Sequence, residues 1–395
     1  MLEHWLWLAT RPGVSDRLKQ SLIERFGDAE EVYFAPGGAY ATVEGVGAEQ
    51  AEALRDKNLT HVWEILHRCK QKGIRLLPCG SESYPPRLRQ IGNPPAVLYA
   101  LGTLPEWDAR PAVALVGTRK ASAYGQSIAR RIGLQAAQCG AIVVSGGAEG
   151  IDTCALEGAL QAQGTAVAVL GCGVDVVYPK KNAALFAKIR EKGCILSEFP
   201  PGTPPTARHF PMRNRVISGI CSGVAVVEAP AKSGSLITAH LAAEQGRDVF
   251  VVPGNIDVDT FAGSTALLRE GAIPIRSGWD ILEEYAAQYP ETVRPVDDES
   301  APPEPQRAAK RPPEPEPEPP KAPASPAPAK AAQPRVRYSL TQGEREIVDQ
   351  LAAPMLLDDL IACSRLPAAQ VLALLTILEI KGIVKRLPGK YIALK

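Results

Sequence analysis

The sequence lacks any excess of charge, because 44 basic and 43 acidic residues leave a formal net charge of +1. Nucleic-acid binding by so balanced a chain requires a local basic patch. Histidine is scarce, with five residues, and the eight cysteines form no C-x-x-C pair, so no metal-ligand spacing is present. We expect no metal or other cofactor, and we expect reduced cysteines in a cytoplasmic protein.

Long apolar runs and targeting features are also missing. The apolar start, Met1–Leu8, carries Glu3 and His4, and it ends at Arg11-Pro12-Gly13, too soon for a signal peptide. No run is long enough to span a bilayer. We therefore expect no association with a membrane.

The 395 residues allow two or three folded units. Residues 1–70 predict a small helical domain with helices at Asp16–Phe26, Glu30–Phe34, Ala48–Lys57 and Thr60–Lys72. The turn Gly45-Val46-Gly47 resembles a helix–hairpin–helix turn, whose backbone N–H groups can hold a phosphate. It has no adjacent basic residue, so a plain turn between helices is the favoured interpretation.

Residues 71–289 alternate short apolar runs with segments of helix length, which predicts an α/β fold with a parallel sheet covered on both faces. Ligands of such sheets bind at the carboxyl ends of the strands. The expected strands are Ile74–Leu77, Ala96–Ala100, Ala112–Val116, Ala141–Ser145, Ala166–Leu170, Cys194–Ser197, Val224–Glu228 and Val249–Val252.

Two further segments follow this domain. Residues 290–337 are rich in proline, alanine, glutamate and lysine, which indicates a semi-extended linker. Residues 338–395 predict a winged-helix domain, with helices at Thr341–Leu351, Met355–Cys363 and Pro367–Lys381 and strands at Ile383–Leu387 and Lys390–Leu394. Its third helix offers only Gln370 to a DNA groove, which favours protein contact or packing over duplex reading.

The loops after the central strands carry the strongest functional signal. Gly117 and Arg119 follow the third strand and lead into a helix, whose N–H groups suit an anion. Alone, this loop would be an ordinary strand–helix turn with a solvated arginine. Four later strands also end in loops rich in Gly, Ser, Asn, Lys or Arg, so the sheet edge predicts a basic groove for a chain of phosphates. Phe210 and Tyr178 offer faces for base stacking.

These loops together resemble the DprA (Smf) family of DNA-processing proteins. The shared motifs, in order, are G-T-R-x-x-S-x-Y-G, S-G-G-A-E-G-I-D, Y-P-K-K-N, S-E-F-P-P-G, H-F-P-M-R-N-R-V-I-S-G and S-G-S-L-I-T-A. The resemblance implies an extended Rossmann-like domain that binds single-stranded DNA, forms a homodimer, and loads RecA recombinase during natural transformation and recombination. It implies a protein that is not an enzyme.

The resemblance also implies roles for particular residues. Arg119 and Lys180 would be the main phosphate contacts, with Lys181 as the substitute if the loop turns differently. The full predicted DNA-binding set is Gly117, Arg119, Ser122, Ser145, Gly146, Lys180, Lys181, Asn182, Phe210, Arg213, Asn214, Ser233, Gly234 and Ser235. The chain departs from the family pattern at Gly147, Leu156 and Thr265, where Leu, His and Asn are usual.

Other side chains near these loops favour structural roles. Arg213 and Arg215 lie two positions apart in a predicted helix and so point to different faces, and we expect Arg213 to face the groove and Arg215 to pack against Glu198 or Glu228. We expect the acidic residues to cap helices or tie loops, because a carboxylate facing phosphates would repel them. These are Asp152, Asp175 and Glu228.

Two alternatives to a DNA-binding protein remain. One is a nucleotide-binding enzyme of the phosphoribohydrolase (lysine-decarboxylase-like) type, whose hallmark P-G-G-x-G-T-x-x-E supplies a catalytic glutamate. The nearest segment here, Ala231–Leu236, lacks that glutamate. The other is a scaffold whose C-terminal helices recruit partners, but it leaves the basic loops unexplained.

Overall fold

The computed structural model describes residues 1–296, 340–351, 355–364, 366–381, 383–387 and 391–394. Contacts divide the chain into two compact units, Met1–Ala308 and Ala309–Lys395. Residues 297–337 of the predicted linker lie outside the described residues, and so do residues 388–390, which comprise the connection between the last two predicted strands and the first residue of the second of them.

The first unit begins with the expected group of short helices. Ser15 and Asp28 cap two of them by accepting hydrogen bonds from backbone N–H groups of the first turn. Gly45, at φ +87°, lies in the turn before the helix Ala48–Arg55, and Gly47 is the N-cap of that helix. The helices are α1 (Leu2–Ala9), α2 (Asp16–Phe26), α3 (Ala29–Phe34), η1 (Ala39–Thr42), α4 (Ala48–Arg55) and α5 (Thr60–Lys72). The sequence had not predicted α1 or η1.

These helices share their apolar core with the sheet that follows. Trp7 of α1 and Ile65 of α5 belong to the same buried cluster as Tyr99 and Ile195 of the sheet. Ion pairs cross the same boundary, since Arg215 reaches both Asp16 of α2 and Glu198. The helical segment is therefore packed onto the sheet domain.

The sheet has nine strands in the order β1-β2-β6-β5-β4-β3-β7-β8-β9. All eight expected strands are present, and β9 is an addition. From β6 to β9 all neighbours are parallel, as expected, whereas β1 and β2 join the edge in antiparallel pairings. The strands are β1 (Arg75–Pro78), β2 (Val97–Gly102), β3 (Ala112–Val116), β4 (Ile142–Ser145), β5 (Ala166–Val169), β6 (Cys194–Ser197), β7 (Gly223–Val226), β8 (Asp248–Val251) and β9 (Ile273–Pro274).

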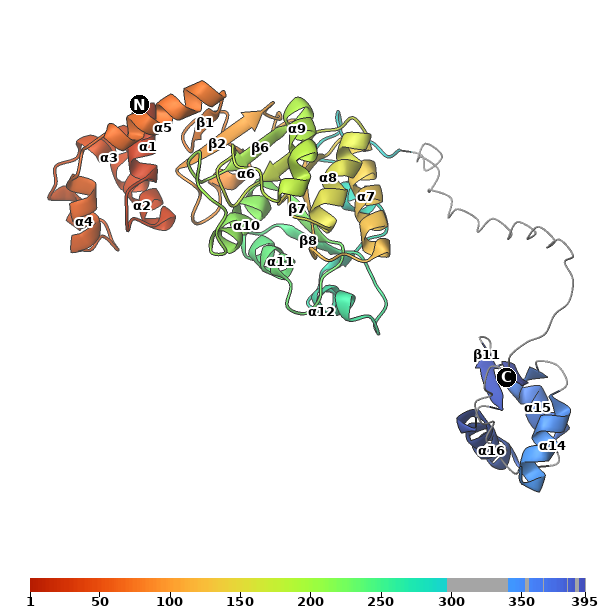
Figure 1. Ribbon diagram of the computed structural model, residues 1–395. Coiled ribbons are helices and arrows are strands. Elements are labelled where there is room, and N and C mark those ends of the chain that lie inside the picture. Colours follow the sequence, from red (N-terminus) through yellow and green to blue (C-terminus); the bar gives the residue numbers. More distant parts are fainter. Residues whose placement is uncertain (297–339, 352–354, 365, 382, 388–390, 395) are drawn as a thin grey trace, which may run out of the picture. The chain divides into compact units, whose positions relative to one another are not determined.

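Helices cover both faces of the sheet (Figure 1). Successive residues of β3 feed opposite cores: Val113 and Leu115 pack into one buried cluster, and Ala114 and Val116 pack into the other. The first core also contains residues of α7 (Ala123–Gln138), α8 (Ile151–Gln161) and α9 (Ala183–Lys192). The second contains residues of α6 (Pro86–Arg89), α10 (His209–Ile220), α11 (Gly234–Glu244) and α12 (Ala262–Arg269).

Short helical turns complete the unit: η2 (Lys180–Asn182), η3 (Asp259–Phe261), α13 (Trp279–Leu282) and η4 (Glu283–Tyr285). The strand order fixes where a ligand can enter. From β3 the chain proceeds through β4, β5 and β6 on one side, and then returns to place β7, β8 and β9 on the other. A crevice forms where the order reverses, outside the carboxyl ends of β3 and β7.

The second unit has the three helices and two strands predicted for a winged helix, and it has a further strand, β10, at Met355–Leu356, where the second helix was expected to begin. The elements are α14 (Gln342–Gln350), β10 (Met355–Leu356), α15 (Leu357–Cys363), α16 (Ala368–Ile380), β11 (Val384–Leu387) and β12 (Tyr391–Leu394), with the strands in the order β10-β12-β11. Val371, Leu375 and Leu378 of α16 are buried, while Leu372 and Ile377 are exposed. The outer face of α16 is therefore partly apolar.

Candidate nucleic-acid interface

A crevice of about 730 Å³ opens at the predicted sheet edge. Its walls come from the loops after β3, β4 and β5, from the segment that leads into α10 and the first turns of that helix, and from the loop from β7 into α11. The residues that line it include Gly117, Thr118, Arg119, Lys120, Tyr178, Phe210, Arg213, Asn214, Lys232, Ser233, Gly234 and Ser235. The structure thus brings together side chains that lie more than one hundred positions apart in the sequence.

The loop after β3 passes very close to its neighbours. A Cβ atom on Gly117 would lie 2.5 Å from Ile151 Cγ1 and 2.8 Å from the Glu228 carbonyl oxygen, so only glycine fits. Ser122 caps α7 by accepting from Gly125 N, and its hydroxyl donates to Glu228 Oε2 at 2.8 Å. Ser122 therefore holds the loop, and Glu228 ties the loops after β3 and β7 together, the role expected of that carboxylate.

The loop after β4 is supported from below. Ser145 is fully buried, and its hydroxyl donates to the Leu115 carbonyl at 2.6 Å. Gly146 lies over Arg213, whose Nη1 donates to the Gly146 carbonyl at 2.6 Å and also to the Val169 carbonyl. Among the predicted DNA-binding residues, Ser145 thus lies behind the crevice wall rather than on it.

Arg213 lines the crevice, but its guanidinium is buried in the floor. Burial lowers the pKa of Arg213 to about 10, while the nearby Asp152 carboxylate raises it, so the group stays charged at neutral pH. Burial also raises the pKa of Asp152, which the charge of Arg213 opposes. Arg215 instead pairs with Glu198 and Asp16. The two arginines divide as expected, although Arg213 reaches the crevice from beneath.

The loop after β5 presents its two lysines differently from its asparagine. Lys180 and Lys181 are exposed, and Lys181 Nζ lies 3.5 Å from a Glu149 carboxylate oxygen. Asn182 is buried, and its Nδ2 donates to the Gly147 carbonyl at 3.0 Å and to Thr153 Oγ1 at 2.8 Å. Asn182 therefore fixes the loop after β4, and Lys180 is the lysine without a carboxylate partner among the described residues.

Two rings and one arginine line up at the rim of the crevice. The ring centroids of Tyr178 and Phe210 are 5.7 Å apart, with their planes inclined by 33°. The guanidinium carbon of Arg119 lies 5.1 Å from the Phe210 ring centroid. We call these three residues the stacking ladder. A second cavity of about 230 Å³ adjoins it and is also lined by Gly146, Gly147, Gly171 and Cys172.

The start of α11 closes the crevice. Ser233 caps this helix and lies 2.7 Å from the hydroxyl of Ser235, and Asn214 Nδ2 donates to the Gly234 carbonyl at 3.3 Å. Lys120 and Lys232 are exposed lining residues that the predicted set did not contain. Their signal was present, because both are basic residues inside strand-end loops.

Of the three departures from the family pattern, Gly147 lines the cavity that adjoins the crevice. Gly147 has φ +66°, and a Cβ atom there would lie 2.9 Å from the Phe186 ring. Leu156 is fully buried in α8, and Thr265 is half-buried in α12. None of them lines the crevice.

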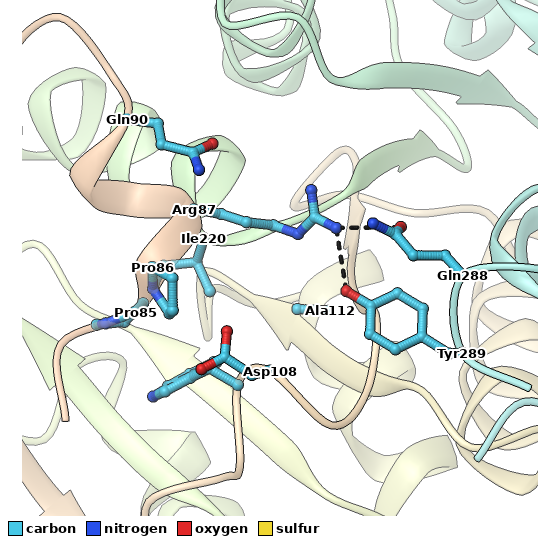
Figure 2. A pocket seen from close by; sticks show the side chains of 10 residues that line it. Pro85, Pro86, Arg87, Gln90, Asp108, Ala112, Ile220, Gln288 and Tyr289 are labelled. Carbon is cyan, nitrogen blue, oxygen red and sulfur yellow. Dashed lines mark hydrogen bonds between the residues drawn. The ribbon is translucent and has the colours of Figure 1, made fainter. Parts of the chain in front are cut away.

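A further pocket of about 330 Å³ lies at the opposite edge of the sheet, by the first residue of β3, Ala112 (Figure 2). Arg87 crosses it, and Nη2 of that arginine donates to the Tyr289 hydroxyl at 3.0 Å and to the Gln288 amide oxygen at 3.4 Å. Its one arginine is thus already engaged by neutral groups, in contrast to the exposed cations of the crevice.

Within the described ranges, no three His, Cys, Asp or Glu side chains are grouped to hold a metal ion. Of the described helices, none combines the length and the apolar character needed to cross a membrane.

The open sheet, the basic crevice at its switch point and the rings at the rim define a Rossmann-like protein suited to a phosphate-bearing ligand. Residues 75–286 match the family described as DNA recombination-mediator protein A, and residues 302–390 match the DprA winged helix domain. The chain belongs to the DNA recombination-mediator protein A (DprA) family.

Relatives and solved structures agree with this assignment. Protein Smf of Synechocystis is 38% identical over 288 residues, which cover 72% of each chain. DNA processing protein DprA of Bacillus subtilis is 38% identical over 58% of this chain and 78% of that protein. The X-ray structure of DprA from Streptococcus pneumoniae gives a TM-score of 0.64 at 33% identity, covering 71% of this chain and 97% of that one. DNA processing protein A from Helicobacter pylori, described for its single-stranded DNA binding mode, gives a TM-score of 0.50 at 29% identity. That match covers 55% of this chain and 97% of that one.

Proposed function

We propose that the protein binds single-stranded DNA in the crevice and delivers it to RecA recombinase during transformation and recombination. The observation that carries the proposal is the stacking ladder, which includes the exposed Arg119, together with the exposed lysines Lys120 and Lys232 of the same crevice. The cations suit consecutive phosphates, and the rings suit unpaired bases, which contribute roughly 1–3 kcal/mol each by stacking. The single-stranded DNA binding mode of the Helicobacter pylori relative supports the same ligand.

The binding is proposed to be non-catalytic. A hydrolase of the phosphoribohydrolase type needs a carboxylate free to move a proton. Here Glu228 accepts from the Ser122 hydroxyl and amide, Asp152 accepts from Ala148 N, and Glu149 pairs with Lys181. Each of these carboxylates has a structural partner, which favours a binding role.

The remaining parts fit partners rather than duplex DNA. Residues 368–380 contain no lysine or arginine, and Leu372 and Ile377 are exposed on α16. A groove-reading helix needs polar or basic side chains on its outer face. We propose that this unit contacts protein, that the DNA-binding unit forms a homodimer, and that the complex acts in the cytoplasm.

A competition titration tests the ligand. Fluorescein-labelled oligo-dT bound to the protein is challenged with unlabelled oligo-dT or with duplex of equal nucleotide content, and AMP hydrolysis is assayed on the same sample. We expect displacement by the single strand at much lower concentration and no release of base. Equal displacement by duplex would overturn single-strand preference, and turnover of AMP would favour the enzyme alternative.

A further inference from the structure

The two rings of the stacking ladder are carried by loops that are tied to each other. Tyr178 lies in the loop after β5, and Phe210 lies in the first turn of α10, directly after the loop that follows β6. Gly173 N donates to the Thr203 carbonyl at 3.0 Å, and Asp175 Oδ1 accepts from Gly202 N at 2.7 Å. Hydrogen bonds therefore join the two loops into one piece.

This piece is anchored from outside the sheet domain, by helix α5. Lys72 Nζ lies 2.5 Å from Asp175 Oδ2, and Arg68 Nη1 donates to the Pro201 carbonyl at 2.8 Å. The Asp175 side chain is only 8% exposed, so its two oxygens are divided between Lys72 and the opposite loop. The last turns of α5 thus hold both loops at once.

The charge state of Asp175 agrees with its role in joining α5 to the two loops. Burial alone would raise the pKa of this carboxyl, yet the hydrogen bonds from Lys72 and Gly202 bring the pKa below its usual value. The carboxylate is therefore charged at neutral pH, where a charge-assisted hydrogen bond is stronger than a neutral one.

We propose that Lys72 and Arg68 are positioning residues for DNA binding: from α5 they hold the paired loops so that Tyr178 and Phe210 stay at stacking distance. This inference rests on the proposed function. It gives the N-terminal helical segment a part in affinity, although its anchoring residues contact the loops and not the crevice. Neither Lys72 nor Arg68 lines the crevice.

The first test uses opposite electrostatic signs. Asp175→Asn removes one negative charge near the crevice, so long-range electrostatics alone would tighten binding of oligo-dT. Loss of the anchor predicts the reverse, because the amide can still accept from Gly202 but no longer pairs with Lys72. We expect Kd to rise about three- to tenfold, since part of a stacking contact is lost. A tighter or unchanged Kd would overturn the proposal.

The second test removes the lysine. Lys72→Met is expected to raise Kd by a similar factor, Lys72→Arg to restore it, and the Lys72→Met Asp175→Asn pair to show less than the summed effect. Lys70→Met is the matched control, because Lys70 is exposed on the same turn and forms no ion pair with a described residue. We expect it to change Kd less than twofold.

Salt dependence separates positioning from direct contact. Loss of a phosphate contact makes the negative slope of log K against log salt shallower by ~0.7 for single strands. Replacement of a positioning residue leaves the slope unchanged. A reduced slope in Lys72→Met would overturn the proposal. Thermal unfolding of each variant confirms that a folded protein is compared, and Lys72→Arg supplies a second folded variant. Failure of the wild-type chain to bind oligo-dT would instead overturn the proposed function.

Discussion

At the scale of single residues, the cations in the crevice and in the loop beside it divide between surface and floor. Arg119 and Lys180 are exposed, whereas Arg213 is buried and committed to the carbonyls of Gly146 and Val169. Only exposed cations can release counterions when phosphates bind. Affinity and its salt dependence should therefore follow the surface pair, while Arg213 should affect the shape of the floor.

The surface pair supplies the first prediction. Replacing Arg119 and Lys180 together by alanine should weaken oligo-dT binding by about 2–4 kcal/mol, because two charge-assisted contacts are lost. The negative slope of log K against log salt should become shallower by about 1.4. Fluorescence anisotropy at several salt concentrations measures both. Lys192→Ala, an exposed lysine at the end of α9, is the control, and an unchanged Kd in the double variant would reject the assignment.

Replacement of Phe210 should weaken binding without changing its salt dependence. Phe210→Ala removes a ring face but no charge, so we expect a loss of ~1–3 kcal/mol in affinity with the same salt slope. The same titration series checks it. If Phe210→Ala binds as tightly as the wild type, base stacking does not occur on this ring.

At the scale of elements, strand-end loops are held by the helices that follow them. Ser122 both caps α7 and donates to Glu228. Ser122→Ala should lower the free energy of unfolding by about 1–2 kcal/mol, the usual effect of losing an N-cap. Urea unfolding measures it. Ser127→Ala, exposed on the same helix, should stay within about 0.5 kcal/mol, and equal losses in both variants would contradict the capping role.

Sequence patterns found the elements more reliably than their directions. Each apolar run of the central sheet became a strand, but β2 pairs antiparallel with β6, and an apolar run carries no sign of its direction. Strand β9 has only Ile273 and Pro274, too few residues for a pattern. Helix α1 was missed because Trp5–Leu8 is apolar without a polar face.

The same limit applies inside the site. Arg119 and Phe210 were predicted because their loops follow strands whose carboxyl ends meet, and both residues line the crevice. Ser145 and Asn182 have equally suitable side chains, yet both turn inward to satisfy buried carbonyls. A polar residue in a strand-end loop has two uses, and the choice between them depends on which buried groups need a partner. That information lies in the tertiary contacts.

At the scale of the whole molecule, the segment Val249–Leu268 is the candidate for the homodimer interface, because it mixes apolar residues with few charges, and it separates into core and surface residues. Phe250, Val251, Val252, Phe261 and Leu267 are buried, whereas Ile256 is 91% exposed and Val258 is 37% exposed. Ile256 and Val258 are therefore the large apolar residues of this segment that are exposed enough to take part in the proposed dimer. Scattered exposed apolar residues are ordinary, so the association itself must be measured.

The final prediction concerns that association. We expect the wild-type chain to sediment as a dimer at micromolar concentration and Ile256→Asp Val258→Asp to sediment as a monomer, since a charge buried in an apolar contact is costly. A dimer carries two crevices, so an oligonucleotide long enough to reach both should bind more tightly than a short one through effective concentration. The monomeric variant should lose this length dependence while keeping its affinity for short oligo-dT. Trp63→Asp, exposed on α5, is the control for a new surface charge. A wild-type monomer that binds long and short strands equally per site would show that the late segment only closes the sheet.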